Sequence, residues 1–361
     1  MSNEVPQEVL EAFTSYSPGL PPHSAGKITV EKIGHGLINR SYKVSCELKP
    51  DFFLQKINTH VFSKPHDVQE NYIYIWQYAE FEFTGLRMPA PVYYEGQATL
   101  YVDETGGYWR AFEWIPDSKT INVALKPAQT KATARAFAKF TAAFEDMNTN
   151  LLKEIIPGFH SLSLRYRQFE ESLNTELCER MAKAVTLVSE LKQRERYKHF
   201  FEIITESGEF SRRVMHHDAK ISNILFHQKT GKPVCLVDYD TVMPGYFFSD
   251  IGDMIRSMVC SRDENSVEGT LSVRKDFYEA ILGGYLDVLG GQLSSSERKY
   301  IHSAGLLMIY MQALRFLTDY LNGDAYYQVA YPEQNFDRTL NQLTLLKSLE
   351  EFLAASYRFK I

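Results

Sequence analysis

The pattern of hydrophobic and polar positions divides the chain into two unlike parts. Between Lys27 and about Trp114, short runs in which apolar and polar residues partly alternate predict β-strands. The runs are KITVEKI, RSYKVSC, FFLQKI, ATLYVD and YWRAFEW. Helical periodicity predicts a short amphipathic helix over residues 5–16 and a second helix from Asp67 to about Phe81. The first part is therefore expected to be a small β lobe with two helices.

The second part is mainly helical. Pro127 stands where a helix can begin, and Phe137, Phe140 and Phe144 follow at helical spacing on an Ala-rich segment. One hairpin-like stretch, residues 223–240, interrupts the helices with the runs NILF and PVCLVDYD on either side of a polar turn. This part is expected to form a large helical lobe with one short β insertion.

These patterns predict an α+β protein with a small antiparallel β lobe and a large, mainly helical lobe. The simplest division gives a helical extension over residues 1–24, a β lobe over residues 25–115 and a helical lobe over residues 116–361. The hinge between the lobes is expected near Glu113–Ser118.

Charge and composition exclude several classes of partner. The formal net charge is −6, which argues against a general nucleic-acid binder. The most apolar stretch, Leu306–Leu317, is interrupted by Gln312 and Arg315, so no membrane span or membrane partner is expected. The four cysteines are scattered without a CxxC pair, and glutamates occupy the N-terminus where a signal peptide needs basic residues. We expect a cytoplasmic protein, as a monomer or weak homodimer.

The most informative segment is VMHHDAKISNILF, together with the strand VCLVDYD that follows it. Asp218 is followed five residues later by Asn223 and twenty residues later by Asp238. Phosphoryl transfer needs these groups, because one carboxylate orients the hydroxyl while a second carboxylate and an amide oxygen hold magnesium. The spacing matches the H-R-D-x-x-x-x-N pattern of kinases. Without the chemistry, Asp218 and Asn223 would cap a turn and Asp238 would be an ordinary strand-end carboxylate.

Upstream features fit the same chemistry. A kinase needs a strand lysine for the α/β-phosphates and a loop above them. Lys56 lies among apolar residues in FFLQKI, and the loop GHGLIN precedes it between two strands. Each feature alone is equally typical of an edge-strand lysine or a plain hairpin turn. For the acidic partner of Lys56, the predicted helix offers Glu70 first and Asp67 second.

The motifs resemble those of the aminoglycoside phosphotransferase and choline kinase superfamily, from about Ile33 to Gln342. They are GHGLINRSY, FLQKINTHVF, IPGFHSLSLRY, HHDAKISN, VDYDTVMPG and RFLTDYLNGDAYY. Within that superfamily the chain looks more closely like the N-acetylhexosamine 1-kinases, which phosphorylate the anomeric hydroxyl of GlcNAc or GalNAc. The resemblance implies a protein-kinase-like bilobal fold, ATP and Mg²⁺ as cofactors, and a small-molecule sugar as substrate. An aminoglycoside, an amino-alcohol or another sugar is the alternative acceptor.

The resemblance also implies roles for individual residues. Asp218 would be the catalytic base, and Asn223 and Asp238 the magnesium ligands. Lys220 would neutralise charge on the transferred phosphate, or else be a surface lysine. The implied nucleotide-binding residues are Gly34, Gly36, Asn39, Lys56, Glu113 and Ile115.

Sugar recognition is expected from the helical lobe. The resemblance implies that Arg315 and Tyr326 bind the hexosamine beside Asp218. Arg315 lies in an otherwise apolar helix, where an unpartnered charge would be costly. A structural salt bridge is the alternative for Arg315, and surface packing is the alternative for Tyr326.

Several polar residues near the motif have less specific interpretations. Asp240 is expected to support the metal site or the structure. Asp250 and Asp253 lie near a predicted helix start, where N-capping is the better interpretation. His216 and His217 are expected to organise the loop, although the family often has Gly or Asn where this chain has His217.

Overall fold

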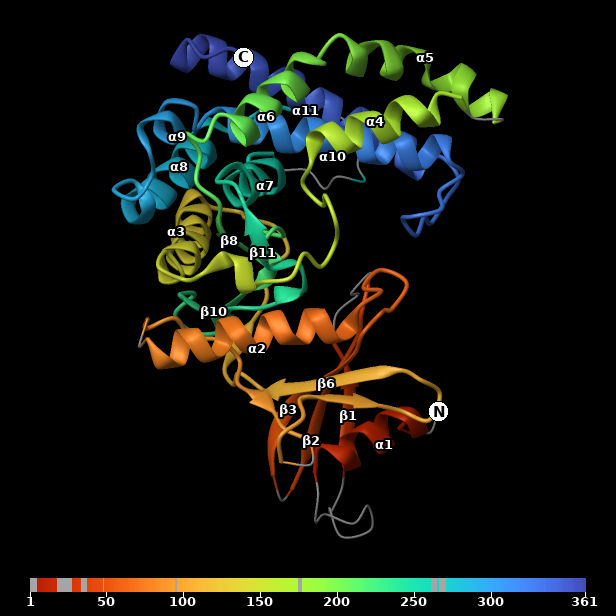
Figure 1. Ribbon diagram of the computed structural model, residues 1–361, viewed down its shortest axis with the longest axis vertical. Helices are drawn as coiled ribbons and strands as arrows, with labels where there is room; N and C mark the ends of the chain where they lie inside the picture. Colours follow the sequence, from red (N-terminus) through yellow and green to blue (C-terminus); the bar gives the residue numbers. More distant parts are fainter. Residues whose placement is uncertain are drawn as a thin grey trace.

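The computed structural model describes residues 5–17, 28–33, 38–47, 49–82, 84–94, 96–174, 177–260, 265 and 271–361. A β lobe, consisting of one sheet with helices α1 and α2, lies at one end of the molecule (Figure 1). A helical lobe, α3 to α11, forms the rest. The predicted α+β architecture, with a small antiparallel sheet before a large helical part, is confirmed.

The sheet of the β lobe is antiparallel throughout, in the order β1-β2-β3-β6-β4, and β5 also pairs with β6. Its strands are β1 (Thr29–Lys32), β2 (Arg40–Cys46), β3 (Lys49–Lys56), β4 (Pro91–Val92), β5 (Leu100–Val102) and β6 (Tyr108–Glu113). Tyr42, Leu54 and Ala111 pair across the three central strands and therefore share one face. This outer face is buried against helix α1 (Gln7–Ser15), where Phe13 stacks on Phe52 with 5.4 Å between the ring centroids.

The inner face of the sheet is turned toward the helical lobe. Helix α2 (Pro65–Phe81) lies across this face, between the sheet and the helical lobe (Figure 1). Its Tyr72 packs edge-on against Phe112 of β6, with ring centroids 4.8 Å apart, and also against Tyr239 of the helical lobe. Aromatic packing through α2 thus joins the two lobes.

The helical lobe is built around α10 (Ser303–Leu321), which is buried along most of its length and packs on α4, α7 and α11. The other helices are α3 (Pro127–Ala143), α4 (Leu162–Ser172), α5 (Cys178–Lys192), α6 (Arg196–Glu206), α7 (Phe248–Met258), α8 (Lys275–Leu289), α9 (Ser295–Lys299) and α11 (Gln334–Tyr357). None of the helices in the described part of the chain is both long and apolar enough to cross a membrane.

Short strands and turns are inserted between α6 and α7. Strand β8 (Arg213–Met215) pairs with β11 (Met243–Gly245), and β9 (Ile224–His227) pairs with β10 (Pro233–Leu236) and β7 (Ser118–Lys119). The 3₁₀ turns η2 (Ile221–Asn223) and η3 (Tyr239–Thr241) belong to this insertion. The turn η1 (Thr149–Leu151) lies earlier, between α3 and α4. The predicted hairpin within residues 223–240 is confirmed as β9 and β10.

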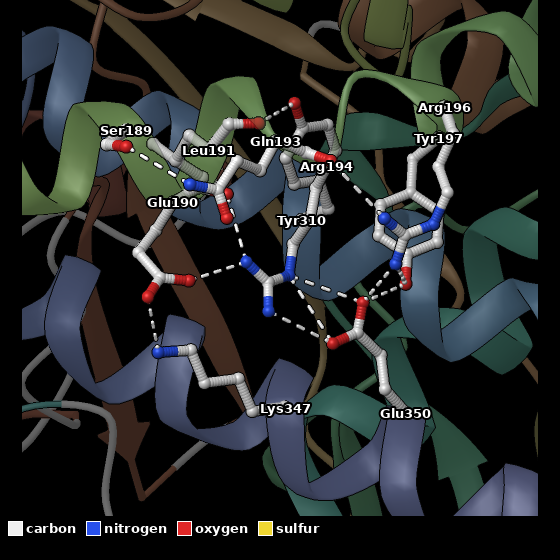
Figure 2. Close-up of polar contacts among 10 residues, drawn as sticks. All are labelled: Ser189, Glu190, Leu191, Gln193, Arg194, Arg196, Tyr197, Tyr310, Lys347 and Glu350. Carbon is white, nitrogen blue, oxygen red and sulfur yellow. Dashed lines mark hydrogen bonds and ion pairs between the residues drawn. The ribbon is translucent and has the colours of Figure 1, made fainter.

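Ion pairs fasten the C-terminal helix to the lobe. Figure 2 shows Arg194, just after α5, lying between Glu190 of α5 and Glu350 of α11. Glu350 also accepts a 2.6 Å hydrogen bond from Arg196, and Lys347 binds Glu190 at 2.9 Å. Because Arg194 is largely buried and contacts two carboxylates, this network stabilises more than an isolated surface pair.

Candidate active site

The loop between β8 and β9 brings the predicted catalytic groups together. Oδ2 of Asp218 accepts a 2.8 Å hydrogen bond from Nδ2 of Asn223 and lies 2.8 Å from Nζ of Lys220. Burial opposes ionisation of Asp218, but the Lys220 ammonium outweighs it and holds the pKa of the carboxyl below its ordinary value. Asp218 in turn raises the pKa of Lys220. The loop therefore presents an ionised carboxylate beside a fixed cation.

Asp250 fixes the backbone of this loop. Its two carboxylate oxygens accept the backbone N–H groups of His216 at 2.9 Å and His217 at 2.8 Å. Burial raises the pKa of Asp250 to about 7, against the effect of the two N–H donors. The prediction that Asp250 caps a helix is wrong: helix α7 begins at Phe248, and the Asp250 side chain points back to the catalytic loop instead. Asp253, also expected to cap, pairs with Arg256 at 2.7 Å.

Both histidines belong to the scaffold of the loop. The His216 ring packs edge-on against Phe137 and Phe140, and its Nε2 lies 3.1 Å from the Val237 carbonyl oxygen. His217 has a φ of 63°, and Nδ1 of its ring contacts the carbonyl oxygen of Thr241 at 3.1 Å. Burial lowers the pKa of each ring to about 4, so both are neutral at pH 7. They organise the loop, as predicted.

The hairpin returns Asp238 to Asn223. The backbone N–H of Val237 donates to the Asn223 carbonyl at 3.0 Å, which places the next residue, Asp238, beside the loop. Because Nδ2 of Asn223 is bound to Asp218, its Oδ1 remains as the acceptor. No hydrogen bond within the described chain holds the carboxylate of Asp238. Burial of the carboxyl group, together with the carboxylates of Asp240 and Asp218, raises its pKa to about 7.

This donor set fits a magnesium ion. Magnesium is bound by one or two protein oxygens together with phosphate oxygens and water. Asn223 and Asp238 could supply those protein oxygens, and the ionisation of Asp238 is disfavoured even though Lys220 and Arg110 are near. Across the described residues, no cluster of three or more His, Cys, Asp or Glu side chains is arranged as a complete metal site. Phosphate oxygens would therefore have to complete the coordination.

The register of the sheet places Lys56 differently from the prediction. Lys56 pairs with Trp109 and shares the outer face of the sheet, which α1 covers. Its Nζ lies 2.8 Å from Oδ2 of Asp103 and 2.9 Å from Oε2 of Glu8. Lys56 thus points away from the helical lobe that carries Asp218.

The predicted acidic partners of Lys56 are wrong. Glu70 and Asp67 lie on α2, on the inner side of the sheet, and bind Lys153 at 2.6 Å and 3.3 Å. Lys56 cannot reach them, because the sheet lies between its side chain and α2.

Asn39 and Asp240 meet between the lobes. Nδ2 of Asn39 donates to Oδ2 of Asp240 at 2.6 Å, and Oδ1 of Asn39 accepts the backbone N–H of Asn58 at 2.9 Å. The other oxygen of Asp240 accepts a hydrogen bond from Arg110 on β6. Of the two roles considered for Asp240, the structure favours the structural one. The predicted glycines, Gly34 and Gly36, lie outside the described residues.

The expected hinge follows β6. The backbone N–H of Glu113 donates to the Ala90 carbonyl at 2.9 Å and so belongs to the sheet. Among the described residues, the Ile115 N–H has no hydrogen-bond partner, while the Ile115 carbonyl accepts the Ser118 hydroxyl at 2.7 Å. The nucleotide-binding role of Ile115 stays a prediction, which needs such an unpaired backbone donor.

A cavity of about 520 Å³ opens between α4, α10 and the segment that follows α10. Its lining includes Arg165, Gln168, Glu171, Arg315, Asp319, Tyr326 and Tyr327. The guanidinium of Arg315 lies 5.1 Å from the Phe159 ring and 5.7 Å from the Tyr326 ring. Phe159 stacks on His160, whose ring lies 4.9 Å from that of His217. The predicted pair Arg315 and Tyr326 therefore lines one cavity, and the rings of Phe159 and His160 connect it to the loop that carries Asp218.

Two arginines of the cavity lack carboxylate partners within the described chain. Nη1 of Arg315 donates to Gln312 at 3.1 Å, so the alternative of a salt bridge is not found there. Arg165 donates to Gln168 at 2.9 Å and to the Phe159 carbonyl. Burial and the neighbouring Arg315 lower the pKa of Arg165 to about 10. From the sequence, residues 160–166 are expected to line the sugar pocket without individual roles, and only the fold brings Arg165 beside Arg315.

Comparison with known proteins gives a family match over most of the chain. A model described as the phosphotransferase enzyme family matches residues 29–286. The matched segment contains Asp218, Asn223 and Asp238.

Solved structures show the same fold at low sequence identity. An aminoglycoside phosphotransferase from Alicyclobacillus acidocaldarius is 13% identical with a TM-score of 0.62, over 94% of this chain and 95% of that chain. An amicoumacin kinase, solved with AMP-PNP, Ca²⁺ and Ami, is 13% identical with a TM-score of 0.62, over 94% and 93%. A choline kinase from Cryptosporidium parvum is 15% identical with a TM-score of 0.55, over 96% of both chains. The predicted protein-kinase-like fold is confirmed.

Proposed function

Because the chain belongs to the phosphotransferase enzyme family, we propose that it transfers the γ-phosphate of ATP to the anomeric hydroxyl of an N-acetylhexosamine, GlcNAc or GalNAc. The observation that carries this proposal is the position of Asp218. Its carboxylate is fixed by Asn223 and Lys220. The rings of His160 and Phe159 connect its loop to a cavity whose two arginines have no acidic partner among the described residues.

The chain's own groups supply positioning and charge. Asp218 accepts the proton of the sugar O1 hydroxyl as the O1–Pγ bond forms and the bond from Pγ to the β-phosphate oxygen breaks, releasing ADP. Lys220 offsets negative charge on the transferred phosphoryl group. Asn223 and Asp238 would hold Mg²⁺, which neutralises charge on the β- and γ-phosphates when bound. Because little covalent chemistry is required of the protein, the rate depends mainly on alignment of O1 with Pγ.

The cavity favours a neutral, oxygen-rich acceptor. A cationic aminoglycoside or amino-alcohol needs carboxylates, whereas Arg165 and Arg315 repel a cation. Of the two carboxylates in the lining, Asp319 already accepts the backbone N–H groups of Tyr326 and Tyr327. Glu171 has a side chain that is 69% exposed. Hydroxyl and acetamido oxygens, by contrast, are suitable acceptors for guanidinium donors, and the Tyr326 ring can pack on a sugar face.

The test is ADP release from Mg-ATP with a panel of acceptors. The panel contains GlcNAc, GalNAc, glucose, kanamycin, choline and ethanolamine at equal concentrations, with a no-acceptor control. We expect release with the N-acetylhexosamines well above that with the cationic acceptors. Release with kanamycin or choline alone would contradict the proposed acceptor and establish the alternative.

A further inference from the structure

We propose that Arg110, and not Lys56, is the β-lobe cation that binds the phosphates of ATP. The inference rests on the proposed use of ATP but not on the identity of the acceptor. It follows from three features: the face of the sheet on which each cation lies, the partners that hold each cation, and the connection of Arg110 to the turn that follows Asp238.

The strand register separates the two cations. Lys56 pairs with Trp109, and Gln55 pairs with Arg110, in the same two strands β3 and β6. Successive residues of a strand point to opposite faces of the sheet. Lys56 therefore lies on the outer face, and Gln55 and Arg110 lie on the inner face that meets the helical lobe. A phosphate bound next to Asp218 and Asp238 is on the inner side.

The ammonium group of Lys56 already has its partners on the outer face of the sheet. Its two carboxylate contacts neutralise its charge, and its Nζ also lies 5.1 Å from the centre of the Trp109 ring. Asp103 is buried and further accepts Trp109 Nε1 at 2.8 Å and the Gly107 N–H at 2.8 Å. Moving Lys56 to a ligand would leave this buried carboxylate without its cation, which is costly. A Cβ at Gly107 would also overlap the Lys56 and Asp103 side chains. Lys56 thus stabilises the β5–β6 turn.

Arg110 is held at the junction of the lobes. Its Nε and Nη2 donate to Oε1 of Gln55 at 2.9 Å and 2.5 Å, and Nη2 also contacts Oδ1 of Asp240. Asp240 is two residues after Asp238. Within the described chain Nη1 has no hydrogen-bond partner, so this nitrogen keeps its two donors for a phosphate. The guanidinium is preorganised, since three of its contacts are already made.

The alternative is that Arg110 only joins the lobes through Asp240. The two roles differ in what Arg110→Met does to different nucleosides. A cation that touches phosphate contributes to binding of ADP but not of adenosine, whereas a structural arginine supports both equally. The ratio of the two dissociation constants therefore isolates the phosphate contact from general damage to the site.

The experiment is calorimetric titration of ADP with Mg²⁺, and of adenosine, into the wild type and four variants. In Arg110→Met we expect ADP binding to weaken by about tenfold or more and adenosine binding to change by less than about twofold. Lys56→Met is the matched control. We expect it to lower the melting temperature but to leave the ratio of the ADP and adenosine dissociation constants unchanged. The double variant Gln55→Lys with Arg110→Met returns a cation to the inner face and should recover part of the ratio. Arg110→Lys, which keeps the charge, serves if Arg110→Met fails to fold and should weaken ADP selectively.

The results distinguish failure of the Arg110 assignment from failure of the proposed acceptor. Equal weakening of ADP and adenosine in the Arg110 variants, or loss of the ratio in Lys56→Met, overturns the inference. If the wild type binds ADP more tightly than adenosine but phosphorylates no N-acetylhexosamine, the proposed acceptor fails while the assignment of Arg110 stands.

Discussion

The anchoring of the catalytic loop by Asp250 leads to a prediction that separates this account from a simple motif match. In Asp250→Ala the backbone N–H groups of His216 and His217 lose their acceptors, which now lie at 2.9 Å and 2.8 Å. Both histidines and Asp250 are buried, so water does not readily replace the carboxylate. The substitution leaves Asp218 itself unchanged but frees the two residues that precede it.

The magnitude follows from these two bonds. Each buried donor without a partner costs about 1–3 kcal/mol, so Asp250→Ala should lower the free energy of unfolding by about 2–6 kcal/mol. In Asp250→Asn one oxygen remains, and the loss should be about 1–3 kcal/mol. Because displacement of a reacting group by about 1 Å costs about a hundredfold in rate, kcat should fall by about 10²-fold in Asp250→Ala. KM for ATP should change much less than kcat.

The assay combines urea unfolding with steady-state kinetics. Asp287→Ala is the control, because the Asp287 side chain is 42% exposed and binds only surface cations among the described residues, Lys131 and Arg135. It should leave both the free energy of unfolding and kcat nearly unchanged, because exposed ion pairs contribute little. If Asp250→Ala is as stable and as active as Asp287→Ala, the clamp does not hold the catalytic loop and the reasoning is refuted.

Three further predictions concern the acceptor cavity, the C-terminal helix and pH. Arg315→Met should raise KM for the N-acetylhexosamine by about tenfold or more, because a hydrogen bond to a charged group contributes about 1.5–3 kcal/mol. KM for ATP should stay unchanged. A parallel rise in both constants would indicate misfolding. Glu350→Ala removes the carboxylate that accepts hydrogen bonds from Arg194 and Arg196 (Figure 2). It should lower the free energy of unfolding by about 1–3 kcal/mol without altering either KM. Unchanged unfolding in urea would contradict this. The pKa of Asp250 rises from 3.8 to about 7 on folding, so the folded protein binds the extra proton and loses stability as pH rises toward 7. The stability cost of Asp250→Asn should therefore shrink, by at most about 1.4 kcal/mol per pH unit, between pH 5 and pH 7; a cost that is constant or grows would show that Asp250 does not titrate there.

The chain order of motifs was enough to predict the fold and the centre of the site. Asp218, Asn223 and Asp238 are close in sequence, and a short hairpin is a local structure that brings its two ends together. Their meeting therefore depends little on long-range packing. The kinase-like arrangement of a small sheet before a helical lobe follows from the change in hydrophobic period.

The wrong prediction of the acidic partners of Lys56 has a specific physical cause. FFLQKI is apolar on both faces, so its pattern does not say which face of the strand is covered. A helix near the N-terminus covers the outer face and brings Glu8 to Lys56, a contact between residues far apart in sequence. The available signal was Gln55 beside Lys56, together with Arg110 in YWRAFEW, since polar residues facing each other in two central strands indicate a buried polar site.

The sequence indicates that residues 160–166 line the sugar pocket, but it does not single out Arg165, for a similar reason. Its contact with the acceptor cavity requires α4 and α10 to pack side by side, and these helices are separated by more than a hundred residues. Sequence periodicity shows which face of a helix is apolar, but not which other helix it meets.

The central claim is transfer of phosphate to the anomeric hydroxyl with Asp218 as the base. The most direct measurement is phosphorus NMR of the protein with ATP, Mg²⁺ and GlcNAc, beside a no-sugar control and the Asp218→Asn variant. The account predicts a sugar 1-phosphate resonance that appears with ADP, is absent without sugar, and is slowed by about 10²–10⁴-fold in the variant. Phosphate on another hydroxyl, or an equal rate in Asp218→Asn, would contradict it.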